Sequence, residues 1–80
     1  MKLWLLSQDE NTGYDTYDSV VVAAKSEEEA RLILPSEYQN WEDGCNYSWV
    51  NDPKLVKVEL IGTAVRGTKV GVVLASFNAG

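Results

Sequence analysis

One segment of this sequence, residues 26–35, has the pattern of a short helix. It separates the predicted strands into those before it and those after it. Ser26 and Glu29 have the spacing of a capping box, in which the hydroxyl accepts the N3 amide and the carboxylate returns to the Ser26 amide. The glutamates at 27–29 also lie where the helix dipole favours negative charge. Pro35 cannot continue the helical hydrogen bonds and disfavours helical geometry in the residue before it. The pattern predicts one short helix over residues 27–34.

Four short apolar runs flank this helix, two on each side. Residues 3–6 and 19–24 are consecutive apolar or β-branched runs, joined by a polar, glycine-containing segment that is typical of a hairpin. Apolar residues alternate with charged ones over residues 56–60, which is the pattern of a half-buried strand. Residues 70–75 predict the last strand, with a bulge or a close approach at Gly71.

The predicted order is therefore β-β-α-β-β in one domain that spans residues 1–80. We expect an α+β fold with a mostly antiparallel four-stranded sheet and one short helix packed on one face. A helix of this length covers only part of a sheet. The other face must then be covered by the long loop over residues 35–53, by a second copy, or by a partner.

Charge is distributed unevenly along the chain. Residues 9–52 contain eleven of the twelve acids and only two of the seven Lys and Arg residues, a formal charge of −9, whereas the remainder carries +4. The acidic stretch also contains six of the eight aromatic residues. Acids together with large apolar rings suit a surface that meets a basic partner. The net charge of −5 argues against direct binding to nucleic-acid phosphates or to an anionic membrane.

Histidine, which many enzymes use, is missing from the sequence. The chain has no histidine, which removes the usual nucleophile pairs, the commonest general base and most zinc and iron sites. It has no glycine-rich phosphate-binding motif. We therefore expect neither catalysis nor a cofactor. The lone Cys45 cannot form an intrachain disulfide and indicates a reducing cytoplasm, and the first residues lack the apolar stretch of a signal peptide.

The segment after the first strand also invites a calcium interpretation. Asp9, Asn11 and Asp15 have the first, third and seventh spacing of an EF-hand loop. The glycine required at the sixth position is Tyr14, and the glutamate required at the twelfth is Val20. A hairpin tip exposed to solvent is the simpler interpretation, and we expect no metal site.

The long loop gives the sharpest candidate for a partner-binding surface, because aromatic residues and acids are interleaved over residues 35–53. Rings dominate interface energetics, and acids at a rim select a basic partner. The alternatives are that some rings fill the core, that the acids mimic nucleic-acid phosphates, or that they only keep the protein soluble. The predicted partner-binding residues are Asp9, Asp15, Tyr17, Tyr38, Trp41, Glu42, Asp43 and Trp49.

Three segments resemble a family of small phage and prophage proteins: residues 8–19, 26–31 and 75–80. The resemblance implies a role directed at the bacterial host. Small, acidic, non-enzymatic phage proteins of this size resemble anti-CRISPR inhibitors, which bind a host effector and block DNA recognition or cleavage. The resemblance carries no functional residues over to this chain.

Two hypotheses follow for the function. The first is a phage-derived inhibitor in the host cytoplasm that binds a bacterial defence protein, such as a CRISPR effector with a basic nucleic-acid groove. The second is a structural or assembly module, a homodimer whose sheet faces pair with Trp4 and Leu6 at the contact. A monomer in solution would exclude the second hypothesis.

Overall fold

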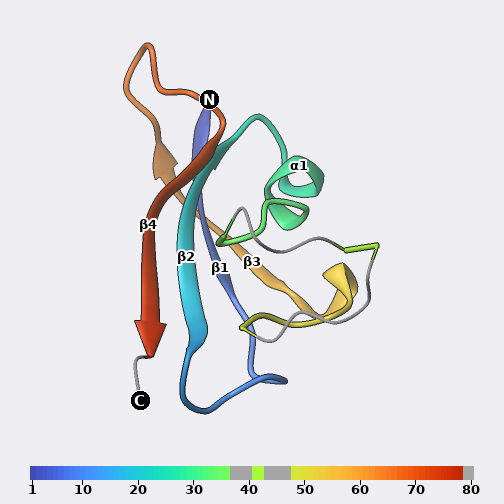
Figure 1. Cartoon of the computed structure of the whole chain (residues 1–80). Coiled ribbons are helices and arrows are strands. Elements are labelled where there is room, and N and C mark those ends of the chain that lie inside the picture. The colour runs from blue at the N-terminus through green and yellow to red at the C-terminus, as the bar shows by residue number, and fades with distance from the viewer. Residues whose placement is uncertain (37–40, 43–47, 79–80) are drawn as a thin grey trace.

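The computed structural model describes residues 1–36, 41–42 and 48–78, apart from the side chain of Asn78. Its elements, in chain order, are β1 (Lys2–Ser7), β2 (Thr16–Ala24), α1 (Glu27–Arg31), the 3₁₀ helix η1 (Pro53–Leu55), β3 (Lys57–Thr63) and β4 (Gly71–Asn78). The strands form one antiparallel sheet in the order β3-β1-β2-β4 (Figure 1). The predicted β-β-α-β-β order, the four-stranded antiparallel sheet and the α+β class are confirmed.

The helix begins as predicted but ends earlier. Ser26 is the N-cap, and its Oγ accepts a hydrogen bond from the Glu29 amide at 3.2 Å. The Glu29 carboxylate returns to the amide of Lys25, at 2.9 Å, one residue before the expected donor. At the other end, the Leu32 and Ile33 amides bond to carbonyls only three residues back, so the last turn is tightened. The regular helix therefore stops at Arg31 and not at Leu34.

The core lies between α1 and one face of the sheet. It contains side chains of β1 and β2 together with Ala30 of α1 and residues that precede β3; these are Trp4, Leu6, Val20, Val22, Ala24, Ala30, Trp49, Val50 and Val56. Trp4 also donates its indole N–H to the Ala24 carbonyl at 3.1 Å. Trp4 and Leu6 are only 8% and 0% exposed. The prediction that these two side chains form a contact between two copies is therefore wrong, because the helix side of the sheet already buries them.

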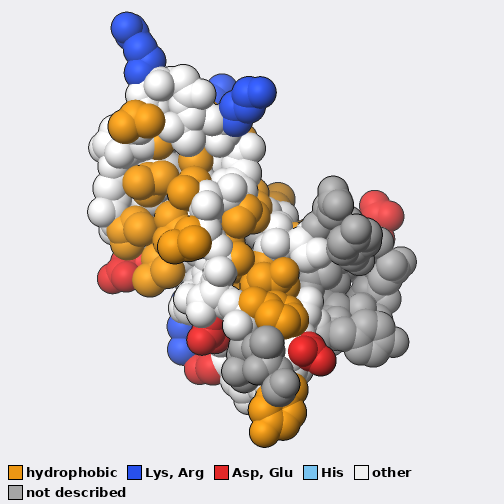
Figure 2. Space-filling view, turned by 60° about the vertical axis from the view of Figure 1, so that its left-hand side comes forward, with side chains coloured by type: hydrophobic (Ala, Val, Ile, Leu, Met, Phe, Trp, Pro, Cys, Tyr) orange, Lys and Arg blue, Asp and Glu red, His pale blue; other side chains and the backbone are white. Residues whose placement is uncertain are grey.

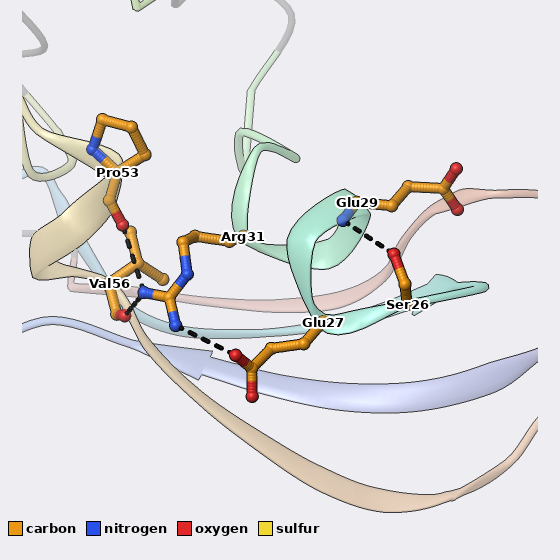
Figure 3. A network of polar contacts seen from close by, with 6 residues as sticks. All are labelled: Ser26, Glu27, Glu29, Arg31, Pro53 and Val56. Atoms are coloured by element: carbon orange, nitrogen blue, oxygen red, sulfur yellow. Dashed lines mark hydrogen bonds and ion pairs between the residues drawn. The ribbon is translucent and has the colours of Figure 1, made fainter.

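Arg31 fastens α1 to the segment that leads into β3. Its Nη1 donates to the carbonyl oxygens of Pro53, at 3.3 Å, and of Val56, while its Nη2 lies 3.6 Å from the Glu27 carboxylate (Figure 3). The guanidinium offers several donors in a fixed plane, so one side chain can hold two carbonyls and one carboxylate. This network links residues far apart in the chain and stabilises η1 next to the helix.

The described part of the long loop packs on the same side of the sheet as the helix. Trp49, Val50 and Val56 belong to the core beneath α1, and Figure 1 places η1 on that side as well. The opposite side, here called the open face, carries the side chains that alternate with the core residues. By strand register it includes Leu3, Leu5, Val21 and Leu74. The long loop was one of the three elements expected to cover this face. Its described residues do not cover it.

Bulges interrupt the ladders that join the central strands to the two edges. The β1–β3 register shifts between Leu3 and Trp4, and the β2–β4 register shifts at two places. One of these shifts skips Val73, close to Gly71, whose φ of 142° L side chains rarely adopt. The bulge therefore falls two residues after Gly71, the position at which it was predicted. Gly71 itself is paired with Ala23, and, its chain neighbours aside, no described atom lies within 4 Å of the position that a Cβ would take there.

Candidate protein-binding surface

Gln8 organises the connection between β1 and β2. Its side-chain amide donates to the carbonyls of Asn11, at 2.8 Å, and Tyr17, at 2.9 Å. Its Oε1 accepts from the amides of Glu10, at 3.0 Å, and Asn11, at 2.8 Å. Because the buried side-chain amide of Gln8 makes all four of these hydrogen bonds, it holds the loop residues that it contacts in one conformation. Gln8 was not predicted as a site residue, because a glutamine at the end of a strand gives no pattern that separates it from a solvent-exposed residue.

Asp9 is paired within the molecule. Lys57 Nζ donates to its Oδ2 at 2.8 Å, and both side chains are largely exposed. The hydrogen bond and charge of Lys57 lower the pKa of Asp9 below its ordinary value, and Asp9 in turn raises the pKa of Lys57. The charge of Lys57 therefore offsets much of the charge of Asp9, which was predicted to bind the partner. The pair contributes little to the negative field outside the molecule.

Three other acids remain exposed around the same loop. Glu10, Asp15 and Asp18, here called the acidic end, lie where β1 passes into β2. Asp15 takes a left-handed conformation with φ of 61°, which Asp tolerates better than most residues. Asp18 is skipped in the β2–β4 register and lies at a bulge. Asp15 thus stays on the candidate surface, and Glu10 and Asp18 join it.

The aromatic candidates lie in three different environments. Trp49 is fully buried, so its ring is part of the core and is not available to a partner. Tyr17 is half-buried against the core and meets Phe77 edge-on, with ring centroids 4.8 Å apart. Trp41 is half-buried and donates its indole N–H to the Leu32 carbonyl at 3.0 Å. The prediction that Trp49 binds a partner is therefore wrong, because its ring fills the space beneath the short helix.

The remaining predicted residues divide between exposed and undescribed positions. Glu42 is exposed. Tyr38 and Asp43 lie outside the described residues, as does Cys45. Among the predicted set, Asp9 and Asp15 both lie in the connection between β1 and β2, whereas Trp41 and Glu42 lie on the segment after α1. Tyr17 lies on β2 beside the edge strand.

An exposed apolar surface that the sequence analysis did not single out lies on β4. Val72, Val73, Leu74 and Phe77, here called the apolar edge, are between 43% and 69% exposed. β4 pairs with β2 on one side and is the last strand of the sheet, so its other side is an edge. Figure 2 shows apolar side chains gathered on this side of the molecule. The strand order decides this exposure, and the order is not readable from the local pattern.

The two ends of the sheet differ in charge. Residues 64–70 connect the two edge strands, and the Ala64 amide bonds to the Met1 carbonyl at 3.0 Å. This connection carries Arg66 and Lys69, which with Lys2 make up what is here called the basic end. In Figure 2, most of the visible Lys and Arg side chains stand at the top, whereas most visible Asp and Glu side chains lie in the lower half, with a basic side chain beside them. The surface charge therefore changes from positive to negative along β4, which runs from the basic end to the acidic end.

The described residues place limited chemistry on this surface. No group of three or more potential metal-ligating His, Cys, Asp or Glu residues occurs in the part of the chain that the structure describes. No helix among those residues is long and apolar enough to cross a membrane.

Comparison with protein-family models, curated proteins and solved structures found no match to this chain. The arrangement offers exposed acids, partly exposed rings and an apolar strand, which are means of non-covalent binding.

Proposed function

We propose that this protein is a phage-derived, non-enzymatic inhibitor that binds a bacterial nucleic-acid-binding defence protein, such as a CRISPR effector, in the host cytoplasm. The observation that supports this proposal is the acidic end, where Asp15 ends the β1–β2 loop and Asp18 lies at a bulge in β2, next to a loop whose Glu10 and Asn11 backbone is held by Gln8. An ordered loop that carries carboxylates suits a groove lined by Lys and Arg, because less backbone entropy is lost when the groove closes on it.

The acids and the rings have separate tasks in this proposal. Glu10, Asp15 and Asp18 increase the rate of encounter with a basic groove, and salt weakens that effect. Trp41 supplies apolar contact with the target, because its ring is partly exposed and its N–H is already bonded to Leu32. Glu42 lies beside it in the chain and is exposed. Asp9 contributes less, because Lys57 lies 2.8 Å from its carboxylate. Blocking follows from occupation of the groove and needs no chemical step.

Capture from a bacterial lysate identifies the target. The tagged protein is incubated with lysates of CRISPR-bearing bacteria, washed at low and at high salt, and the retained proteins are identified by mass spectrometry. The retained effector is then purified, and its binding to its own nucleic acid is measured with and without this protein. We expect competition for the nucleic acid, and an effector that binds both at once would contradict blocking of the groove.

A matched pair of variants tests the surface. Asp15→Asn with Asp18→Asn removes two of the three charges of the acidic end, whereas Glu27→Gln with Glu28→Gln removes the same charge from α1. We expect the first pair to slow association about tenfold or more at low salt and to flatten its salt dependence, and the second pair to have a smaller effect. Equal effects of the two pairs would show that only net charge matters. Trp41→Ala should increase the dissociation rate; Trp49 is unsuitable for this test because its ring is core.

A further inference from the structure

We infer that two copies of this protein associate through antiparallel pairing of their β4 strands, which joins their sheets into one eight-stranded sheet. β4 presents the apolar edge, and its eight residues, Gly71–Asn78, include no charged side chain and no proline. Charges and prolines are the usual means by which an exposed strand avoids pairing with another chain. β4 has neither, although it is longer than an average strand.

The other edge of the sheet is different. β3 carries Lys57 and Glu59, whose charges oppose the approach of another strand, and the bulge in the β1–β3 ladder disturbs its regularity. β4 also has a bulge, at Val73, so bulges do not separate the two edges; the difference is that β4 carries no charged side chain over its whole length. Of the two edges, β4 is therefore the one suited to strand addition.

The charges at the two ends of β4 select a second copy of this chain as the occupant. Antiparallel pairing places the start of β4, beside Arg66 and Lys69, next to the end of β4 in the other copy, where Asp15 and Asp18 lie. Opposite charges therefore meet at both ends of the contact. Parallel pairing would place like charges together.

The symmetry of such a dimer makes its centre predictable. An interface with a twofold axis uses the same surface of both copies, so residues in the middle of β4 approach their own counterparts. Leu74 lies there, with its side chain on the open face and 69% exposed. Pairing would bury it against the second copy and continue the apolar strip formed with Val21 and Leu5. The net charge of −5 on each copy opposes association, so the dimer should be concentration-dependent.

Sedimentation equilibrium of the full chain over a wide concentration range tests this inference. We expect a reversible monomer–dimer equilibrium for the wild type, and Leu74→Lys should raise its dissociation constant at least about tenfold, because two lysines then face each other across the axis. The matched control is Leu60→Lys, which places the same change at an exposed leucine of β3 and should leave dimerisation unchanged. Far-UV circular dichroism and urea unfolding check that both variants fold.

Charge reversal tests the antiparallel arrangement. Asp18→Lys reduces the net charge to −3, so it would strengthen association if overall repulsion alone mattered. Pairing of opposite ends predicts instead that Asp18→Lys and Lys69→Glu each weaken the dimer, and that the double variant recovers much of the loss. A wild type that stays monomeric, a Leu60→Lys effect equal to that of Leu74→Lys, or a double variant weaker than either single one would overturn the inference. The dimer uses the same acids as the inhibitor proposal, so Leu74→Lys separates the two: it leaves the acidic end unchanged and should weaken the dimer without weakening capture of an effector.

Discussion

Lys57 Nζ lies 2.8 Å from Asp9 Oδ2 and joins the beginning of β3 to the loop after β1. The pair connects two neighbouring strands at the end of the sheet where the acids gather. It reduces the negative field there, and it also gives the protein a site whose protonation can be followed directly.

Lys57→Met should raise the pKa of Asp9 toward its ordinary value, since the lysine hydrogen bond and charge are what lower it. Carbon-detected NMR titration of the aspartate carboxyl groups measures this shift. Lys54→Met is the control, because Lys54 precedes the strand and makes no ion pair with Asp9 among the described residues. An Asp9 pKa that is the same in wild type and Lys57→Met would contradict the pairing.

The pH dependence of stability follows from the same pair. The folded-state pKa of Asp9 is lowered, so its contribution to stability is present above its unfolded pKa and is lost as the pH falls through the folded value. The folded-state pKa of Lys57 is raised, so the pair is lost again as the pH rises through that value. The difference in stability between wild type and Lys57→Met should therefore be flat near neutrality and shrink at both extremes. Urea unfolding at a series of pH values measures it, and the effect should be small because both groups are exposed.

Trp49 should be the most costly side chain to truncate. It is fully buried, so Trp49→Ala should lower the free energy of unfolding by about 3–5 kcal/mol, enough to unfold much of so small a domain. Its indole N–H makes no hydrogen bond with the described residues, so Trp49→Phe loses area but no bonded polar group and should cost clearly less. Urea unfolding followed by circular dichroism compares the two. Equal losses would show that the indole nitrogen has a partner.

The parts of the fold that local sequence determines were predictable. Ser26, Glu29 and Pro35 act within a few residues of one another, so the helix start and its approximate end could be read directly. The end at Arg31 depends on hydrogen bonds that tighten the last turn before Pro35, which no periodicity reports. Strand order depends on contacts between distant residues, and therefore the exposure of Leu74 on an edge strand could not be predicted.

The candidate site was less predictable for the same reason. Trp41 and Trp49 are eight residues apart in a segment without periodicity, yet one remains partly exposed and the other fills the core. Their difference comes from the space that a five-residue helix leaves over the sheet. Asp9 could be identified as an exposed acid, but its pairing with Lys57 joins residues 48 positions apart.

Gln8 should control the order of the acidic end. Gln8→Leu keeps a side chain of similar size but leaves the loop amides of Glu10 and Asn11 without their acceptor, which should cost about 1–3 kcal/mol. Gln8→Glu keeps that acceptor but loses bonds that the amide donates, and an ionised carboxylate would repel the carbonyl oxygens of Asn11 and Tyr17, so the variants are compared at acid pH, where the new glutamate is protonated. Amide hydrogen exchange at Glu10 and Asn11 should therefore accelerate strongly in Gln8→Leu and less in Gln8→Glu. Unchanged exchange in Gln8→Leu would show that the loop is held by other contacts.

Arg31 should stabilise the domain mainly through the two carbonyls that it binds and not through its ion pair. Arg31→Met removes the hydrogen bonds to Pro53 and Val56 and keeps most of the apolar stem, so we expect a loss of about 1.5–3 kcal/mol. Glu27→Gln removes the exposed partner at 3.6 Å and a favourable charge at the helix N-terminus, which together should cost less than about 1 kcal/mol. Urea unfolding of both variants decides between the two contributions. If Glu27→Gln were as destabilising as Arg31→Met, the ion pair would be the dominant contact between α1 and its neighbours. Arg31→Lys should behave like Arg31→Met, because an ammonium group cannot reproduce the planar arrangement of donors that reaches both carbonyls.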